Sequence, residues 1–222
     1  MRPKRDVNSV RFTDVKRNQA EVLGSELFKD PNDASEFVTK AGAFRALLEV
    51  LRSEGVFDQV RAAADPQVLP LIDQPPLPIS WMPAIAFQYL FRAMWSVLPP
   101  DEFRRVSRGS VLAGPMKVMR PIIEGTLRLF GASPVAFFRR MPGVMAAQVK
   151  GIEFEFVVLE DDHAVLEVRY PVLVDVPEPA FVYWEAVVQN TFDICGCEGS
   201  ATTELLEVPD HNRARINLSW KT

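Results

Sequence analysis

Apolar residues in the first two thirds of the chain recur at the three- and four-residue spacing that is typical of helices. The predicted helical segments are 34–53, 57–64, 81–97 and 133–140, with a broken segment over 101–130. Five prolines between positions 65 and 80 predict an extended loop, and Ser80 is suited to cap the helix that follows it. That helix is apolar on most of its faces, so we expect it to be buried.

The spacing changes after Gln148, where apolar and charged residues begin to alternate. Residues 152–156 and 166–170 alternate in this way and predict two antiparallel strands joined by a turn. A helix is predicted over 180–194 and a second hairpin over 202–220. Two hairpins separated by a helix can join into one antiparallel sheet with helices on one face. The sequence therefore predicts an α+β fold, in which an N-terminal helical layer packs on a small antiparallel sheet of two hairpins separated by a helix.

Length and charge narrow the expected organisation and partners. The 222 residues predict an N-terminal arm over 1–32 and a single domain over 33–222. The formal net charge of −4 does not provide the concentrated positive charge that nucleic-acid binding requires. No apolar run reaches the ~18 residues of a membrane span, and no apolar signal segment follows Met1. We therefore expect a cytoplasmic protein with no nucleic-acid partner and no membrane span.

Aromatic residues gather in the predicted helix over 81–97. Three of them, Phe87, Phe91 and Trp95, are four residues apart, so a helix places them on one face. Methionines nearby add adaptable apolar surface, which suits a ligand pocket when combined with aromatic rings. Core packing alone also explains such a stripe, and the pattern does not separate the two interpretations. For the pocket interpretation, the predicted ligand-binding residues are Trp81, Phe87, Phe91, Trp95, Met119 and Trp184.

Cys195 and Cys197 flank Gly196, the predicted end of the helix over 180–194. A metal or redox site is one interpretation, but a structural zinc needs about four ligands and the chain has no second cysteine pair. The C-terminus of a helix also opposes thiolate formation. We therefore favour two small buried residues without a disulfide, and we expect no metal and no cofactor.

Two charged clusters each carry two interpretations. Three carboxylates precede His163 in the turn over 160–163, where acid–base or metal chemistry is conceivable but a solvated hairpin turn is favoured. Arg104, Arg105 and Arg108 could meet an anion, although a solvated helix face is favoured. The chain has no nucleophile or phosphate-binding motif that would favour the chemical interpretations.

Several stretches of the chain resemble a known superfamily. The supporting stretches are residues 42–48, Trp81-Met82-Pro83, residues 98–105 and the final Leu218-Ser219-Trp220. Over roughly residues 35–221, the chain is similar to the superfamily of the haem–nitric-oxide-binding domain, the 4-vinyl-reductase-type sensor domain and the small subunits of the TRAPP vesicle-tethering complex. Within it, the chain most resembles a paralogous family of myxobacterial proteins of unknown function.

The resemblance implies ligand binding, but the chain departs from the members with defined chemistry. Haem-binding members need a proximal histidine on a helix, whereas His163 and His211 lie at predicted turns, so we expect no haem ligation. The sensor domains hold a metal through a cysteine in the last hairpin, and residues 202–220 contain none. Some TRAPP subunits carry an acyl chain in an apolar channel, which implies that such a channel needs no catalytic residue.

These patterns lead to a ligand-binding or sensory module for an apolar small molecule, without intrinsic catalysis. The ligand would stabilise one packing of the helices, and a surface would report that state. One alternative is a homodimeric scaffold that binds a protein partner through an exposed helix or sheet edge. Another is a small tailoring enzyme acting on an apolar substrate, with Glu124, Tyr183 and Asp193 as candidate catalytic residues.

Overall fold

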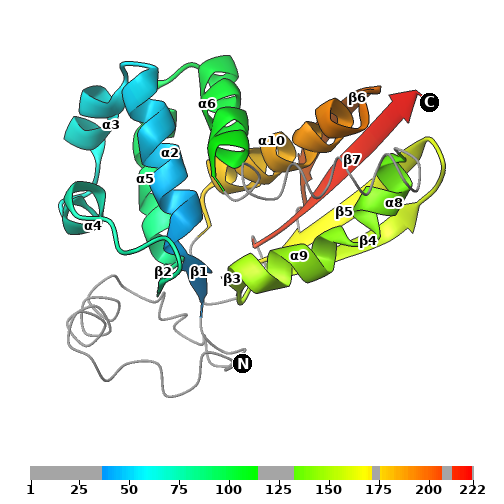
Figure 1. Ribbon diagram of the computed structural model, residues 1–222, viewed down its shortest axis with the longest axis horizontal. Helices are drawn as coiled ribbons and strands as arrows, with labels where there is room; N and C mark the ends of the chain where they lie inside the picture. The colour runs from blue at the N-terminus through cyan, green and yellow to red at the C-terminus, as the bar shows by residue number, and fades with distance from the viewer. Residues whose placement is uncertain (1–36, 115–132, 172–175, 207–211, 222) are drawn as a thin grey trace, which may run out of the picture.

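The computed structural model describes residues 37–114, 133–171, 176–206 and 212–221. A helical layer forms one side of the molecule and a four-stranded sheet forms the other, as Figure 1 shows. The long helix α10 (Glu178–Cys195) runs between them. The predicted α+β class is therefore confirmed.

The helical layer follows the predicted apolar spacing closely. It consists of α2 (Ala41–Ser53), α3 (Phe57–Ala63), α4 (Leu69–Asp73), α5 (Ile85–Val97) and α6 (Pro100–Ala113). In α2, Phe44, Leu47, Leu48 and Leu51 are buried, which is the stripe that three- and four-residue spacing produces. Helix α2 packs on α6, and α3 packs on α5.

Two predicted helix starts are wrong, because short strands occupy them. Strand β1 (Val38–Lys40) replaces the beginning of the predicted helix over 34–53, and β2 (Trp81–Pro83) replaces the beginning of the helix over 81–97. Strand β1 pairs antiparallel with β2 and with β3 (Val149–Lys150), which gives a three-stranded sheet in the order β2-β1-β3. Ser80 therefore caps no helix, and α5 begins after Ala84 without a side-chain cap.

Proline explains the other differences in the helical segments. Helix α4 lies inside the region predicted as an extended loop, and it carries a proline in its first turn, where the missing N–H costs no helical hydrogen bond. The segment predicted over 133–140 is α8 (Pro134–Phe138). A second helix, α9 (Met141–Gln148), follows it and also has a proline in its first turn. The predicted segment over 101–130 is helical to Ala113, and its part beyond residue 114 lies outside the described residues.

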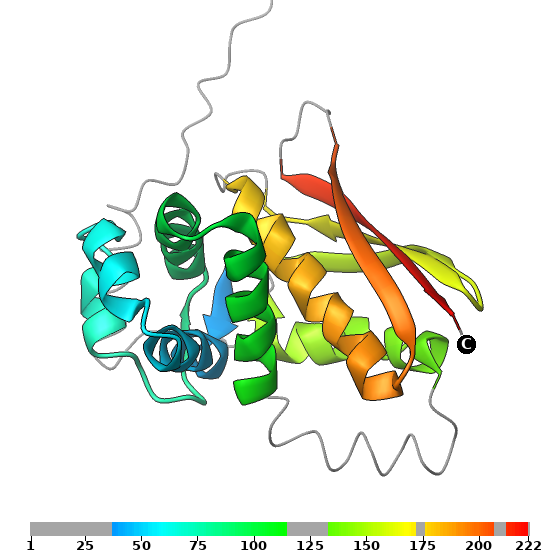
Figure 2. The same cartoon turned by 90° about the horizontal axis from the view of Figure 1, so that it is seen from above.

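The two predicted hairpins join into one antiparallel sheet in the order β4-β5-β7-β6. The strands are β4 (Glu153–Leu159), β5 (His163–Arg169), β6 (Glu198–Leu205) and β7 (Arg213–Lys221). The central pairing brings Leu166 opposite Ile216. Alternate residues of these strands face inward, and Leu166, Val168, Ile216 and Leu218 are buried. Helices α8, α9 and α10 lie on this one face of the sheet (Figure 2).

Helix α10 joins the two layers. It packs on α5 and α6 of the helical layer and on β6 and β7 of the sheet. Gly196 ends it at a φ of 67°, in the left-handed region that glycine adopts without strain, as predicted. Buried apolar residues of both layers form one contiguous cluster around this helix. Within the described segments, no helix combines the length and the apolar character needed to cross a bilayer.

Candidate functional site

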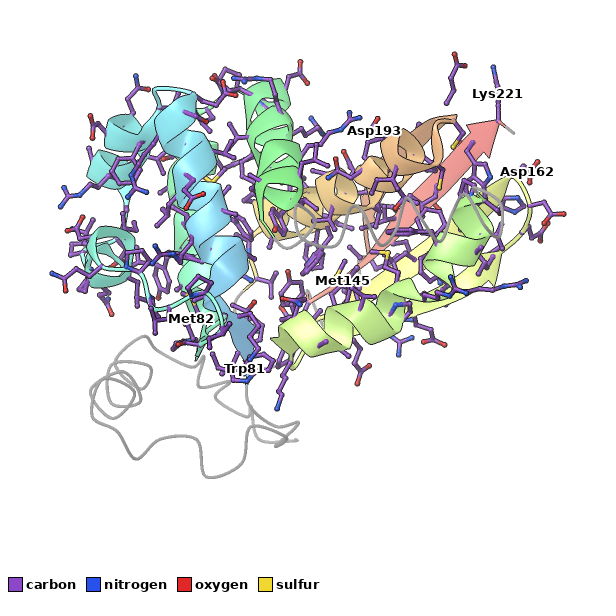
Figure 3. The ribbon with its side chains drawn as sticks, viewed as in Figure 1. Trp81, Met82, Met145, Asp162, Asp193 and Lys221 are labelled. Atoms are coloured by element: carbon purple, nitrogen blue, oxygen red, sulfur yellow. The ribbon has the colours of Figure 1, made fainter. Side chains whose placement is uncertain are left out.

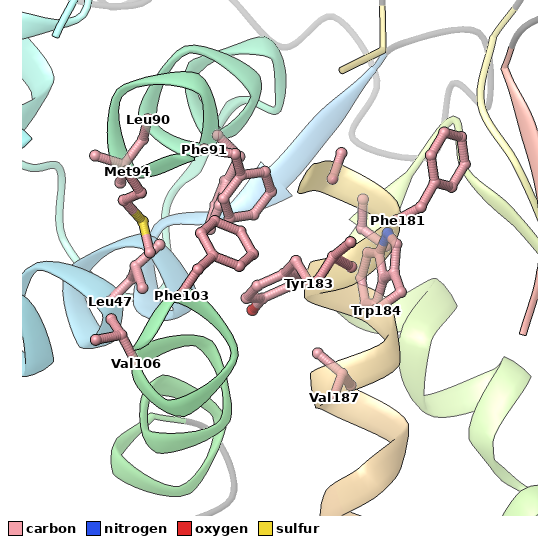
Figure 4. Close-up of a cluster of buried hydrophobic side chains, with 14 of the residues drawn as sticks. Leu47, Leu90, Phe91, Met94, Phe103, Val106, Phe181, Tyr183, Trp184 and Val187 are labelled. Carbon is pink, nitrogen blue, oxygen red and sulfur yellow. The ribbon is translucent and has the colours of Figure 1, made fainter. Parts of the chain in front are cut away.

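An aromatic cluster connects the helical layer to α10. We use this name for Phe87 and Phe91 of α5, Phe103 of α6 and Tyr183 of α10, all of which are buried. The ring centroids of Phe91 and Tyr183 are 4.7 Å apart, and those of Phe91 and Phe103 are 6.1 Å apart. Figure 4 shows Tyr183 directed from α10 toward Phe91 and Phe103. Tilted and edge-to-face rings at these separations attract one another beyond their burial.

Trp184 continues the aromatic contacts toward the sheet. Its ring lies 5.4 Å from that of Tyr183 and 4.8 Å from that of Phe154 on β4. The indole N–H donates a 2.7 Å hydrogen bond to the hydroxyl oxygen of Tyr170. Neighbouring residues of α10 thus contact opposite layers, because consecutive positions on a helix point about 100° apart.

The structure brings together only some of the predicted ligand-binding residues. Phe87, Phe91 and Trp184 are buried and linked through Tyr183, and Trp95 joins them through a 5.1 Å contact with Phe103. Trp81 lies apart, on β2 of the three-stranded sheet. Met119 lies outside the described residues. The ligand-binding role of these residues stays a prediction.

Polar side chains tie α10 to both layers, and the sequence analysis missed them. The carboxylate of Glu185 accepts a 2.9 Å hydrogen bond from Arg104 of α6 and another from the backbone N–H of Thr203 on β6. Asn190 donates to the carbonyl oxygen of Arg108, and Gln189 donates to that of Gly199. The sequence did carry a signal for these contacts, because Glu185 is a charged residue within an apolar stretch of the predicted helix. Buried carboxylates need partners, so Glu185 predicts contacts across the helix.

The candidate catalytic residues of the tailoring-enzyme alternative do not converge in the described structure. Burial raises the pKa of Tyr183 to about 12, partly offset by a hydrogen bond with Ser110, so its phenol stays protonated near neutrality. Asp193 is exposed and paired with Arg108, away from the aromatic cluster, and Figure 3 shows it near the end of α10. Glu124 lies outside the described residues.

The arginines over 104–108 face carboxylates and are not merely solvated. Arg104 pairs with Glu185, Arg105 with Glu54 and Glu102, and Arg108 with Asp193. The positive charges of all three arginines are therefore paired with carboxylates of the same chain. This arrangement leaves little reason to expect an external anion there.

The two cysteines are free thiols. Both are half-buried, whereas the sequence predicted that they would be buried. Burial, with a smaller contribution from nearby Cys197, raises the pKa of Cys195 to about 11. At that value the thiol carries almost no thiolate near neutrality, so it is a poor nucleophile and a poor metal ligand. No group of three or more metal-ligating side chains forms within the described ranges.

The acidic turn at the first hairpin is solvent-exposed, in agreement with the favoured interpretation. His163 begins β5, and its Nδ1 lies 2.8 Å from a carboxylate oxygen of Asp162. This hydrogen bond with Asp162 raises the pKa of His163. His211, the other histidine, lies outside the described residues.

A buried carboxylate on the outer face of the sheet was also missed. Glu167 is 1% exposed beneath three guanidinium groups, those of Arg169, Arg213 and Arg215. Burial would raise its pKa, but hydrogen bonds from Arg213, Arg169 and Arg215 outweigh this effect and lower the pKa to about 2. Alternate positions 167 and 169, and 213 and 215, share a strand face, and this was the signal in the sequence.

Comparison of the sequence with protein-family models and with curated proteins finds no match. Comparison of the fold with solved structures does find matches. The Fe(II) unliganded H-NOX protein from K. algicida covers 82% of this chain and 97% of its own, with a TM-score of 0.58 and 9% identity. An oxygen-binding H-NOX domain related to soluble guanylate cyclases matches over 82% of this chain and 95% of its own length, with a TM-score of 0.54 and 14% identity.

These neighbours include an Fe(II) protein, so the fit of this chain's donors to a haem iron bears on its function. Haem iron is held by histidine, a cysteine thiolate, methionine or tyrosine. His163 lies at the exposed turn and not beside the core. The raised pKa values of Tyr183 and Cys195 keep both groups protonated near neutrality. His163, Tyr183 and Cys195 are therefore unsuited to hold a haem iron, and the absence of haem stays a prediction.

The haem–nitric-oxide-binding part of the predicted superfamily is thus supported by fold. No finding bears on the likeness to 4-vinyl-reductase-type domains, TRAPP subunits or the myxobacterial family, which stays a prediction. Identities of 9–15% establish the fold and nothing finer. The described part of this chain adopts the fold of the H-NOX domains.

Proposed function

We propose that this chain is a sensory domain that binds an apolar small molecule and performs no catalysis of its own. One observation carries the proposal. The aromatic cluster is a group of buried rings contributed by α5, α6 and α10, at the place where the helical layer meets the helix that also covers the sheet. Apolar and aromatic linings with few polar groups are typical of small-molecule sites.

The polar contacts of α10 provide a route for a signal. A ligand that enters beside Phe91 and Tyr183 changes the packing of α10 against α5. Glu185 and Gln189 connect the same helix to β6, so a shift of α10 moves both contacts. The ligand would act by stabilising one of two packings, and the outer edge of the sheet would report it.

The fold adds support by analogy. One structural neighbour is named as an oxygen-binding domain, so this fold is compatible with binding small ligands. Haem is disfavoured here because His163, Tyr183 and Cys195 are unsuited to hold its iron. An apolar organic molecule, held by Phe87, Phe91, Trp95 and Trp184 among the residues predicted from the sequence, is the ligand class that the aromatic cluster favours.

Thermal melting with a ligand panel tests this proposal. The panel consists of naphthalene, which is apolar and uncharged, and haem. A ligand present at 100 times its Kd stabilises the native state by about 2.7 kcal/mol, which for a chain of this length raises the Tm by about 5–10 °C. We expect naphthalene to produce this rise, and haem to produce none.

A pair of variants locates the binding site. Phe91→Leu removes a ring of the aromatic cluster, whereas Phe192→Leu removes a buried ring that packs on Phe138 and Trp220 near the sheet. Both variants lower the Tm of the free protein, but only Phe91→Leu should reduce the rise caused by the ligand. A Tm that responds to haem alone, or equally in both variants, would contradict the proposal.

A further inference from the structure

Two lysines share one indole on the three-stranded sheet. Lys40 of β1, Trp81 of β2 and Lys150 of β3 lie on neighbouring strands. The Nζ atom of Lys40 is 4.0 Å from the centroid of the Trp81 ring, and that of Lys150 is 5.0 Å from it. Figure 3 shows Trp81 at the edge of the molecule near β1. Both ammonium groups are therefore attracted to the same ring.

The positive charge at this place lacks a matching anion. The Nζ atom of Lys150 is buried and has no hydrogen-bond partner among the described residues, although an ammonium has three N–H donors. Lys40 donates to a neutral acceptor, the carbonyl oxygen of Ile79, at 3.0 Å. Within the described structure no carboxylate pairs with either lysine. A buried ammonium without an acceptor is unfavourable, so an anion supplied from outside would be stabilised here.

The loop before β2, whose backbone Lys40 contacts, carries two exposed aliphatic side chains. Leu77 is 69% exposed and Ile79 is 80% exposed, and Ile79 is the residue whose carbonyl oxygen Lys40 contacts. Large aliphatic side chains next to paired cations and an indole make an amphipathic surface. Such a surface complements a molecule with an anionic head and an apolar tail.

We infer that Lys40, Trp81 and Lys150 form a binding site for the phosphate or carboxylate head of an amphipathic molecule, with its apolar tail on Leu77 and Ile79. This site is separate from the aromatic cluster. None of its three polar or aromatic residues contacts Phe91 or Tyr183 through a ring. Its ligand is either a free amphiphile or a lipid in an anionic membrane, since both present the same head chemistry.

Titration of the full-length protein with octyl phosphate, followed by calorimetry, tests the site. Octanol is the matched probe without the charge. We expect octyl phosphate to bind and octanol to bind at least about ten-fold more weakly. Lys150→Gln should weaken octyl phosphate by about ten-fold or more. Lys221→Gln makes the same charge change at the far end of β7, which Figure 3 labels, and should bind as the unchanged protein does.

Vesicles distinguish the two sources of the anionic head. Binding to phosphatidylglycerol vesicles but not to phosphatidylcholine vesicles, lost in Lys150→Gln, assigns the site to a lipid surface. Binding of octyl phosphate without vesicle binding assigns it to a free amphiphile. Equal affinities of Lys150→Gln and Lys221→Gln for octyl phosphate, or equal binding of octanol, would overturn the inference.

Two further variants keep the test decisive. If Lys150→Gln does not fold, as judged by circular dichroism, Lys40→Gln replaces it, because Lys40 hydrogen-bonds only to an exposed carbonyl oxygen. Phe91→Leu should leave octyl phosphate binding unchanged. Failure of the aromatic-cluster proposal and failure of this inference therefore give different results.

Discussion

Glu167 shows how one residue can hold a charge inside the molecule. It occupies an outward-facing position of β5, yet the side chains of Arg169, Arg213 and Arg215 cover it. Removing the carboxylate charge would leave three guanidinium groups close together without their shared acceptor. The stability that this cluster contributes must therefore depend on the ionisation of Glu167.

The pH dependence of unfolding measures this contribution. The pKa of Glu167 falls from an ordinary value of 4.5 to about 2 in the folded protein. A lowered pKa stabilises the native state fully above pH 4.5 and loses that effect as the pH falls toward 2. Because the arginines are partly exposed, we expect the loss to be about 1–3 kcal/mol.

Urea unfolding at several pH values between 5 and about 2.5 would detect the loss. Glu167→Gln should be less stable at pH 5 and should show a smaller fall at low pH than the unchanged protein. Glu198→Gln, which changes an exposed glutamate, is the control and should keep the full fall. A Glu167→Gln variant with an unaltered pH profile would refute the assignment.

Gly199 is required by a close approach and not by its backbone conformation. A side chain there would place its Cβ 2.5 Å from Cγ of Phe192. We expect Gly199→Ala to lower the free energy of unfolding by about 1–3 kcal/mol, because buried Phe192 must shift. Gly143→Ala, in α9 with nothing within 4 Å of the new Cβ, should raise it by up to about 1 kcal/mol. Urea unfolding of both variants distinguishes steric crowding from a general effect of glycine replacement.

At the scale of elements, α10 organises the molecule. Its aromatic residues contact the helical layer through Tyr183 and the sheet through Trp184, and its polar residues also bind both layers. Glu185 is central, because one carboxylate satisfies a side chain of α6 and a backbone N–H of β6. Which of these two contacts matters more follows from exposure. Arg104 is nearly half exposed, so solvent screens its ion pair, whereas the N–H of Thr203 is a backbone donor held in place by β6.

A double-mutant cycle tests this ranking. We expect Glu185→Ala to cost about 1–3 kcal/mol of unfolding free energy, mostly because the N–H of Thr203 loses its acceptor. Arg104→Ala should cost less than about 1 kcal/mol, and the coupling between the two changes should be of similar size. A coupling that accounts for the whole effect of Glu185→Ala would show that the ion pair dominates instead.

At the scale of the whole molecule, the buried residues of both layers form one contiguous cluster. We therefore predict that residues 33–222 unfold in a single cooperative transition. Leu47→Ala in α2 and Ile216→Ala in β7 each remove a fully buried side chain and should each cost about 2–5 kcal/mol. In both variants, tryptophan fluorescence and far-ultraviolet circular dichroism should report the same shifted midpoint in urea.

Separate transitions would contradict this prediction. If Leu47→Ala shifted one transition and Ile216→Ala another, the helical layer and the sheet would be independent units. The sensory mechanism proposed above would then lose its physical basis, because α10 could not transmit a change in packing from one layer to the other.

The candidate site was only partly predictable, because local spacing shows which residues are buried but not which distant residues they contact. Four-residue spacing placed Phe87 and Phe91 on one face of a helix, and burial of that face follows from its apolar character. The partner ring, Tyr183, is about ninety residues away in the chain, and no local pattern pairs it with Phe91. Trp81 was predicted to bind the same ligand, but the structure places it in β2, with Lys40 and Lys150 beside its ring.

The amino-acid sequence by itself determined the elements whose spacing is long and regular: α2, α5, α10 and the four strands of the larger sheet. Burial of a periodic apolar face is a local requirement, so it can be recognised from neighbouring residues alone. Tertiary structure decided the short strands β1, β2 and β3, whose few residues become strands only by pairing with distant segments. It also decided which buried charges find partners, because Glu167 and Glu185 are stabilised by residues that only the folded chain brings close.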